Sequence, residues 1–402
     1  STDNSVGTIS ISSPRIYFSQ VFLNSESDGA GAAGVLSIQG KSLTLDRSQI
    51  HAVSKGVFVR QLGLVQLTGT DDLLINNSLL DSTSEGQAQG GTISIEGGKV
   101  TLNEDLITAN SNGDGRGGQV SVKADVLRVS NSQLTSKSVV SGDAGDVMLD
   151  ARLITLDTAA EVSSETLSLD GNAGGVTIKG GEVVLEDATI SSKTSGGNGH
   201  AGTVNVDSDS LSLADSTISS DTEGLGDAGS VVIHTGHLQV LGNDRAFTSI
   251  TSDTFSDGDA GGVTIVAKTM VVRDQGYISS DTFGYGNAGA VSIDAGSLKV
   301  LNGSHLSSDS WRNGNAGDIS IRADSLTIDS SDSSRQTYIS SDSLEGGDAG
   351  NVTINASTLS VVHGGFISSN TYSGGDAGDL SITAGTMTVQ NTAAIASVAY
   401  PG

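Results

Sequence analysis

One short pattern recurs along almost the whole chain: a glycine that is followed, two and four residues later, by branched apolar residues. In Asn287-Ala288-Gly289-Ala290-Val291-Ser292-Ile293 the marker glycine is Gly289. The marker also occurs at Gly7, Gly34, Gly63, Gly91, Gly118, Gly145, Gly174, Gly202, Gly229, Gly261, Gly317, Gly350 and Gly378. Neighbouring markers lie 27 to 33 residues apart, and the commonest interval is 28. A fixed period of this length indicates a repeat architecture in which each repeat packs on the next.

Each repeat carries the pattern of three short strands. The apolar pair after the marker, such as Val291 and Ile293, alternates with other residues, which is typical of a strand with one buried face. A second pair, such as Leu298 and Val300, predicts another strand, and a third strand is centred on one apolar residue such as Ile278. The connections are too short for crossover helices, so parallel pairing has to come from coiling of the chain.

These patterns predict an all-β, right-handed parallel β-helix, or β-solenoid, of about fourteen turns, with three short strands per turn and a triangular cross-section. Right-handed winding is expected because parallel crossovers nearly always have that hand. We expect residues 1–402 to form a single domain with 28-residue turns. The two longest intervals predict small corner insertions near 242–246 and 329–336.

Composition agrees with this architecture and excludes some functions. The 54 glycines and the abundant serine, asparagine and aspartate suit a chain that turns three times per repeat, because these residues tolerate positive φ or hydrogen-bond their own backbone. A net charge of −26 excludes a general nucleic-acid binder, which needs a basic face. The sequence has no apolar run long enough for a membrane span and no visible signal peptide. Because the chain starts and stops without polar caps, we expect it to be a fragment of a longer repeat protein.

The repeats resemble those of a known family. Units such as Gly286 to Ile293, continued by Leu298 to Val300 and a strand such as Ile278-Ser279-Ser280-Asp281-Thr282, are similar to filamentous-haemagglutinin-like exoproteins, the cargo of bacterial two-partner secretion. The resemblance implies a right-handed parallel β-helix that an outer-membrane transporter partner exports to the surface of a Gram-negative bacterium. It also implies a role in adhesion, aggregation or biofilm matrix, in some members through exopolysaccharide binding.

Four columns of side chains are expected to face outward around the third strand of six consecutive turns, since side chains alternate along a strand. We name them the first rail, the serine column, the aspartate column and the second rail. The first rail is Thr217, Ser249, Tyr277, His305, Tyr338 and Phe366. The serine column is Ser219, Thr251, Ser279, Ser307, Ser340 and Ser368. The aspartate column is Asp221, Asp253, Asp281, Asp309, Asp342 and Asn370. The second rail is Glu223, Phe255, Phe283, Trp311, Leu344 and Tyr372.

This arrangement suggests a carbohydrate-binding surface, because sugars combine apolar ring faces with hydroxyl groups. The predicted binding residues are Phe255, Tyr277, Phe283, His305, Trp311, Tyr338, Phe366 and Tyr372, together with Asp253, Asp281, Asp309 and Asp342. The alternative is a structural wall, since stacked rings and serine ladders also stabilise the turns of a solenoid. Arg245 and Arg335, in the two insertions, are expected to clamp an anionic sugar or to be solvated loop charges.

The aspartate column raises the question of calcium. Like charges about 4.8 Å apart repel one another, and Ca²⁺ between turns would offset this repulsion. The predicted ligands are Asp221, Asp253, Asp281, Asp309 and Asp342, although no EF-hand or nonapeptide calcium spacing is present. No other cofactor is expected. A second polar column, which precedes the marker and includes Asp143, Asn172 and Asn287, is expected to hydrogen-bond the backbone.

The sequence favours a protein that presents a repeated binding surface over one that catalyses a reaction. Catalysis needs a singular cluster of acid, base or metal-ligating groups, whereas the six histidines are scattered and the carboxylates recur from turn to turn. We therefore expect no enzyme. The expected function is an extracellular adhesin segment, secreted to the bacterial cell surface, that supports cell–cell or cell–matrix adhesion and biofilm aggregation by engaging extracellular polysaccharide or a neighbouring cell surface. The alternative is a passive rigid stalk that displays a binding domain outside this fragment.

Overall fold

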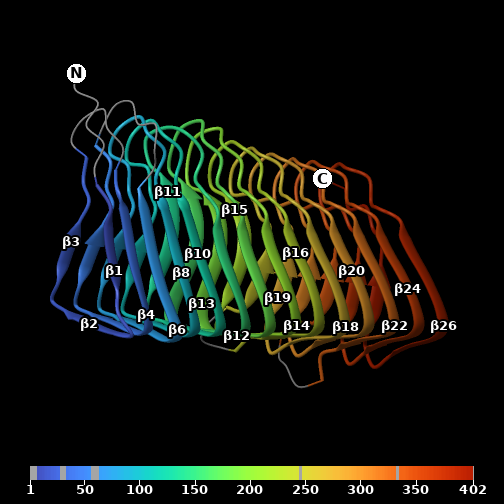
Figure 1. Ribbon diagram of the computed structural model, residues 1–402. Helices are drawn as coiled ribbons and strands as arrows, with labels where there is room; N and C mark the ends of the chain where they lie inside the picture. The colour runs from blue at the N-terminus through green and yellow to red at the C-terminus, as the bar shows by residue number, and fades with distance from the viewer. Residues whose placement is uncertain (1–6, 28–32, 56–62, 244–246, 332–334, 402) are drawn as a thin grey trace. The chain divides into compact units, whose positions relative to one another are not determined.

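The computed structural model describes residues 7–27, 33–55, 63–243, 247–331 and 335–401 (Figure 1). Within these residues every regular element is a β-strand, and no helix is present. The predicted parallel β-solenoid is confirmed, with about 13 turns against the fourteen expected. The chain divides into two compact units, Ser1–Gly202 (unit 1) and Thr203–Gly402 (unit 2). Among the described residues there is accordingly no helix that could cross a membrane.

The strands alternate between long and short along most of the chain. Unit 1 contains β1 (Ile9–Ser12), β2 (Arg15–Ser19), β3 (Phe22–Asn24), β4 (Val35–Asp46), β5 (Gln49–His51), β6 (Leu64–Asn76), β7 (Leu79–Asp81), β8 (Thr92–Asn103), β9 (Leu106–Thr108), β10 (Gln119–Ser130), β11 (Gln133–Ser138), β12 (Val147–Thr166) and β13 (Val176–Thr194). Unit 2 contains β14 (Val204–Ala214), β15 (Thr217–Thr222), β16 (Val231–Leu241), β17 (Ser249–Thr251), β18 (Val263–Arg273), β19 (Tyr277–Ser279), β20 (Val291–Leu301), β21 (His305–Ser307), β22 (Ile319–Asp329), β23 (Tyr338–Ser340), β24 (Val352–Val362), β25 (Phe366–Ser368), β26 (Leu380–Gln390) and β27 (Ala394–Ala396).

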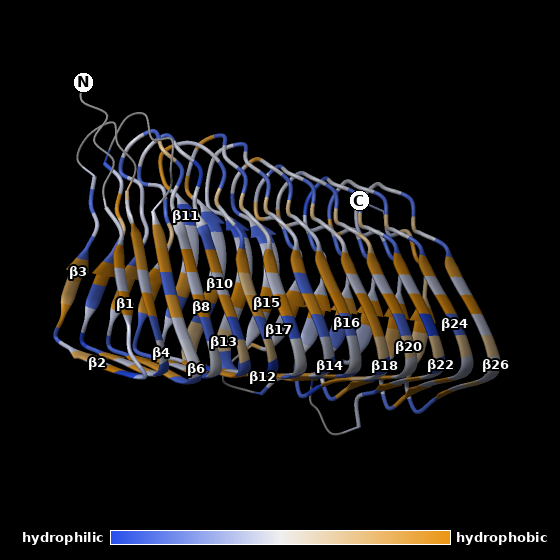
Figure 2. Cartoon of the chain, viewed as in Figure 1, coloured by the Kyte–Doolittle hydropathy of each residue, from blue (hydrophilic) through white to orange (hydrophobic). Residues whose placement is uncertain are grey.

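Successive turns pair in the register that the marker predicts. In unit 2, Val291 of β20 pairs in parallel with Ile319 of β22, and Leu298 pairs with Leu326. These residues are almost completely buried, and Figure 2 shows the apolar positions of neighbouring strands side by side as bands. The core of each unit is therefore a set of stacked aliphatic columns, in which each side chain lies on its counterpart one turn away.

The three predicted strands of a turn are distinct in the first turn, as β1, β2 and β3, whereas from β4 onward the first two run together as one long strand. In β20 the buried positions shift phase between Ile293 and Leu298, and the parallel pairing skips Gly296. The chain thus bends within an extended segment, since Gly296 and Ser297, between the buried Ala295 and Leu298, turn the buried face without breaking the ladder. In β12 and β13 the third predicted strand is continuous with the first two as well.

Most of the marker glycines lie too close to the preceding turn for a Cβ atom, although Gly7 has no neighbour within 4 Å, and none of the described markers has positive φ. A Cβ atom on Gly289 would overlap the carbonyl oxygen of Gly261 and the hydroxyl of Ser280. Ser280 Oγ donates a hydrogen bond to Gly261 O, so a serine of one strand fastens the marker of the preceding turn. Among the described glycines, positive φ occurs only at Gly142, Gly197, Gly303, Gly364 and Gly374.

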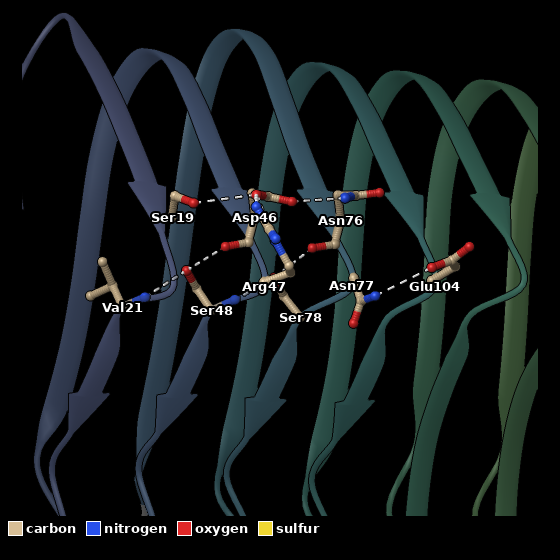
Figure 3. A network of polar contacts seen from close by, with 9 residues as sticks. All are labelled: Ser19, Val21, Asp46, Arg47, Ser48, Asn76, Asn77, Ser78 and Glu104. Atoms are coloured by element: carbon tan, nitrogen blue, oxygen red, sulfur yellow. Dashed lines mark hydrogen bonds and ion pairs between the residues drawn. The ribbon is translucent and has the colours of Figure 1, made fainter.

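Many of the corners before the short strands use a left-handed residue that is not glycine. In unit 1, φ is 46° at Arg47 and 49° at Asn77. Polar side chains tie successive corners together (Figure 3): Asn76 Nδ2 donates to Asp46 Oδ1 at 2.9 Å, and Ser48 Oγ donates to Asp46 O at 3.0 Å. These bonds fix the direction in which each short strand leaves its corner. The predicted insertions lie at this corner in unit 2, between β16 and β17 and between β22 and β23, and residues 244–246 and 332–334 are outside the described part.

Candidate functional site

The first rail is a stack of half-buried rings on the short strands of unit 2. β19, β21, β23 and β25 place Tyr277, His305, Tyr338 and Phe366 in register, one above the other. The ring centroids of Tyr277 and His305 are 5.1 Å apart, with planes 3° from parallel. His305 and Tyr338 are 4.7 Å apart and 11° from parallel. The predicted stacking in this rail is therefore confirmed for these three rings.

The second rail stands where the short strands end. Phe255 and Phe283 stack with centroids 5.1 Å apart and planes 4° from parallel. Phe283 and Trp311 stack at 5.6 Å and 22°. Phe255 and Trp311 expose 51% and 46% of their surface, so this rail is open to solvent. Tyr372 stacks with Tyr400, one period further on, at 5.0 Å.

A groove of about 500 Å³ runs between the two rails. Its sides are the rings of both rails, and its floor is formed by members of the serine and aspartate columns. The lining residues from the two rails are Tyr277, His305, Tyr338, Phe255, Phe283 and Trp311, and those of the floor are Ser279, Ser307, Asp253, Asp281 and Asp309. The groove thus brings most of the predicted carbohydrate-binding residues together. Phe366, Tyr372 and Asp342 belong to the same columns but lie outside its lining.

The prediction that the serine and aspartate columns face solvent is wrong for the serine column and for the middle of the aspartate column, whereas Asp221 and Asp342 are partly exposed. Ser279 is 1% exposed, and the exposed fractions of Asp253, Asp281 and Asp309 are 6%, 7% and 8%. These side chains do point away from the core, because they alternate with buried residues such as Ile278. The rails on both sides shield them, so they form the floor of a groove rather than an open stripe.

Hydrogen bonds between turns hold the aspartate column. Asp281 Oδ1 accepts a hydrogen bond from Asp309 N at 2.7 Å, and Asp281 Oδ2 accepts one from Ser307 Oγ at 3.0 Å. Asp309 repeats this pattern, since Oδ1 accepts from Asp342 N at 2.7 Å and Oδ2 from Ser340 Oγ at 2.8 Å. Each carboxyl group therefore satisfies an amide and a hydroxyl of the next turn. These hydrogen bonds give a structural explanation for the recurrence of aspartate at this position, which the sequence pattern alone did not reveal.

Burial favours the protonated form of these carboxyl groups. Burial, followed by the charge of Asp221, raises the pKa of Asp253 to about 8. Burial, followed by the charge of Asp342, raises the pKa of Asp309 to about 7. The pKa of Asp281 is likewise well above its ordinary value, because it is buried between Asp309 and Asp253. At neutral pH the column therefore holds fewer negative charges than carboxyl groups.

The other groups of the groove have distinct charge states. Burial lowers the pKa of His305 to about 4, so its ring is neutral at pH 7. Burial raises the pKa of Tyr277 and of Tyr338, which keeps both phenols protonated. Arg335 lines the rim of the groove and is exposed, whereas Arg245 lies outside the described residues. The two interpretations of these arginines, a clamp for an anionic sugar and solvated loop charges, stay predictions.

The same repeat position carries alternating charges in unit 1. Lys137, Glu165 and Lys193 each follow the central apolar residue of the third strand by three positions, as the aspartates do in unit 2. They pair in register, and Lys137 Nζ lies 2.8 Å from Glu165 Oε2. Burial raises the pKa of Glu165, but hydrogen bonds and the lysine charges lower it more, so the net shift is downward. Unit 1 therefore pairs its carboxylate with an ammonium group, which unit 2 does not do at Asp253, Asp281 and Asp309.

Two aromatic residues of the site were missed by the sequence patterns. Tyr400 lies one 28-residue period after Tyr372, so the period itself was a sufficient signal. Phe247 follows the first insertion and meets Tyr277 edge-on, with centroids 6.3 Å apart. Because the insertion breaks the period there, no register signal could have placed Phe247 in the groove.

The calcium prediction gains no support from the geometry. Across the described residues, no three His, Asp or Glu side chains are grouped in a way that could hold a metal ion. The polar column before the marker has the backbone role expected of it, since Asn287 N donates to Asp259 Oδ1 at 2.7 Å and Asn315 N donates to Asn287 Oδ1 at 3.0 Å. Calcium at the aspartate column stays a prediction.

Unit 1 has a larger hollow of about 700 Å³, which we do not take as the candidate site. It lies along the corner residues Arg47, Asn77 and Glu104, and no aromatic ring lines it. Its buried carboxyl group is Asp105, which accepts hydrogen bonds from Ser78 N and Asn103 N, both at 2.8 Å. This hollow is an open polar corner whose buried groups are engaged in the fold.

Comparison of the chain with family models, with curated proteins and with solved structures finds no match. The resemblance to filamentous-haemagglutinin-like exoproteins therefore stays a prediction.

Proposed function

We propose that the chain is an extracellular adhesin segment, and that the groove between its aromatic rails engages polysaccharide to support cell–cell or cell–matrix adhesion. The observation that carries this proposal is the pair of stacked rails on either side of a groove of about 500 Å³. Exposed aromatic patches on a protein surface mark sites of interaction more often than chance would give. The repeat also offers the same contacts in turn after turn, which suits a polymer with a repeating unit.

The ring geometry is compatible with a sugar. Rings in van der Waals contact lie about 3.5–4.0 Å apart, so parallel rings with centroids 5.1 Å apart have to be slipped past each other. Slipped rings leave a strip of each face uncovered, and the 51% exposure of Phe255 agrees with this. A sugar can place its apolar C–H groups against such strips and direct its hydroxyl groups to the serines and aspartates of the floor.

The test removes the centre of the second rail. In the variant Phe283→Ala/Trp311→Ala, we expect retention on immobilised polysaccharide to fall about 5- to 150-fold, since two aromatic contacts contribute about 1–3 kcal/mol. The immobilised polymers should include neutral glucans, N-acetylated polymers, polymers with free amines and polyuronates. Tyr17→Ala, which removes an exposed ring in unit 1, is the matched control and should bind like the unchanged protein.

A second candidate, a passive stalk, is favoured by the fact that the same contacts stabilise the fold. The rings stack mainly on one another, and the aspartate column is hydrogen-bonded from turn to turn. These contacts would exist without any ligand. If the unchanged protein binds none of the four polymer classes, or if the double variant is retained equally well, the segment is a stalk and the adhesin proposal fails.

A further inference from the structure

We propose that the groove selects polysaccharides that carry ammonium groups, such as amino sugars with free amines, and that Asp253, Asp281 and Asp309 bind these groups. This inference rests on the proposed function of the same groove and narrows its ligand to one class. Three features of the structure support it: the alternating charges at the equivalent position of unit 1, the free acceptor capacity of the aspartates, and the spacing of the turns.

The first feature is the contrast between the two units. In unit 1 the ammonium group of Lys137 lies 2.8 Å from the carboxylate of Glu165, its neighbour one turn away. In unit 2 five consecutive turns carry aspartate at the equivalent position. The pKa values of Asp253, Asp281 and Asp309 are shifted by burial, by the neighbouring aspartates and by hydrogen-bond donors. A ligand with amines would supply the cations that lysine supplies in unit 1.

The second feature is the acceptor capacity of the floor. Burial favours the protonated form of these carboxyl groups in the empty groove, and an ammonium group bound beside them would favour the ionised form. An ionised carboxylate has about four lone-pair sites, and Asp281 uses two of them for Asp309 N and Ser307 Oγ. The same two bonds are made by Asp309 to the following turn. All three aspartates line the groove, so their remaining lone pairs are within reach of a ligand that lies in it. A primary ammonium group has three donors and no acceptor, which matches a floor of unused acceptors.

The third feature is the regular spacing. Neighbouring turns of a parallel ladder lie about 4.8 Å apart, so the carboxyl groups of the floor recur at that interval along the groove. A chain of linked sugars also presents its substituents at regular intervals. Several weak ion pairs in one groove add up through effective concentration, although each partly exposed pair contributes little by itself.

The remaining charges around the groove are compatible with a cationic ligand. His305 is neutral at pH 7, and the phenols of Tyr277 and Tyr338 are protonated. Arg335 is the cation at the rim, and because it is exposed its repulsion is screened by salt. The net charge of −26 attracts a polycation to the chain as a whole. Faces of the flanking rings give an ammonium group a further favourable contact.

The experiment compares two oligosaccharides that differ only in acetylation. A glucosamine hexamer with free amines and its fully N-acetylated counterpart are titrated into the full chain at pH 6.5, and a hexamer of uronic acid is the third probe. We expect the amine oligomer to bind at least tenfold more tightly than the acetylated one, and its affinity to fall with added NaCl. We expect the uronic acid oligomer not to bind.

The variants separate the charge from the shape of the floor. Asp281→Asn keeps the size and the acceptor oxygen of the side chain, and it should weaken binding of the amine oligomer by at least tenfold and binding of the acetylated oligomer by a much smaller factor. Asp281→Lys installs the ammonium group that unit 1 carries and should have the same effect. Asp294→Asn, an exposed position of β20, is the control and should change nothing.

The outcomes distinguish this inference from the proposed function. Equal binding of the amine and acetylated oligomers, or preferential binding of the uronic acid oligomer, overturns the ammonium inference and leaves the polysaccharide groove in place. Binding of the amine oligomer that is unaffected by both Asp281 variants also overturns it. If no polysaccharide of any class binds, the proposed function fails and this inference fails with it.

Discussion

Replacing Asp309 by asparagine tests whether the aspartate column carries protons near neutral pH. Burial and the neighbouring Asp342 raise the pKa of Asp309 to about 7 in the folded chain, against about 3.9 in an unfolded one. Asparagine keeps an oxygen that can accept the hydrogen bond of Asp342 N, and its amide group is as neutral as a protonated carboxyl group. The substitution therefore imitates the protonated side chain and removes its titration.

The sign of the effect follows from the direction of the pKa shift. A carboxyl group with a raised folded-state pKa binds more protons in the folded state, so its contribution to stability is complete below pH 4 and is lost as the pH rises toward 7. Between pH 5 and pH 7 this amounts to about 2 pKa units at about 1.36 kcal/mol each. The free energy of unfolding of Asp309→Asn, relative to the unchanged protein, should therefore rise by up to about 3 kcal/mol between pH 5 and pH 8.

The assay is urea unfolding followed by the fluorescence of Trp311. This is the only tryptophan of the chain, and its ring stacks on Phe283 in the second rail, so it reports on the turns around Asp309. Burial lowers the pKa of His305 to about 4, so that ring does not titrate between pH 5 and pH 8. The exposed Asp294→Asn is the control and should leave the free energy of unfolding within about 0.5 kcal/mol of that of the unchanged protein. A stability difference for Asp309→Asn that is constant, or that shrinks as the pH rises, would refute the reasoning.

Two further predictions concern the fold of each unit. Gly261→Ala should lower the free energy of unfolding of unit 2 by about 1–3 kcal/mol or more, because its Cβ would overlap Gly229 O and Ser252 Oγ. The adjacent Gly262→Ala, whose nearest neighbour is 3.6 Å away, should change it by less than about 0.5 kcal/mol, and thermal melts of the two variants that coincide would contradict the packing argument. Lys137→Ala should destabilise unit 1 by about 1 kcal/mol, because it leaves the half-buried Glu165 without its ion pair. Urea unfolding of Lys137→Ala, Glu165→Gln and the double variant measures this, and a coupling energy of zero would show that the pair contributes nothing.

The sequence predicted the register of the fold well, because one signal was repeated many times. The marker placed Val291 opposite Ile319, which is the pairing in the structure. The same period placed Tyr277 beside His305 and Phe255 beside Phe283, and both pairs are stacked. Once the coiling of the chain is known, residues one period apart have to be neighbours, so these contacts needed no further information.

At the candidate site the sequence predicted which way the side chains point, but not how much of their surface is exposed. The alternation of side chains along the strand correctly predicted that Asp281 points away from the core, yet only 7% of its surface is exposed. Exposure depends on the height of the flanking side chains, and rings such as Tyr277 and Phe283 are tall enough to enclose a shorter carboxyl group. The hydrogen bonds of Asp281 to Asp309 N and Ser307 Oγ also depend on side-chain torsions that a repeat pattern does not encode.

The role of the marker glycines could not be read from composition either. Glycine serves two separate needs, backbone freedom and lack of a Cβ, and a sequence shows the residue without showing which need applies. Gly303 and Gly364 have positive φ, whereas Gly289 is a glycine because the turn before it lies too close. The left-handed corners do not always use glycine: Arg47 and Asn77 have positive φ without a left-handed glycine beside them, whereas Asn302 and His363 stand directly before Gly303 and Gly364.

The in-register pairing of the turns has a consequence for how such a chain can change its length. Val263 of β18 pairs with Val231 of β16 on one side and with Val291 of β20 on the other. Excising residues 262–289 would join Gly261 to Ala290 and pair Val291 with Val231. The new contact between turns would have the same register as the contacts that it replaces. Gene duplications or deletions that span one whole period therefore lengthen or shorten the protein and keep equivalent residues paired across the junction. A few additional residues are accommodated where they fall at a corner, since Val231 still pairs with Val263 and Ile319 with Val352 across the two longer turns.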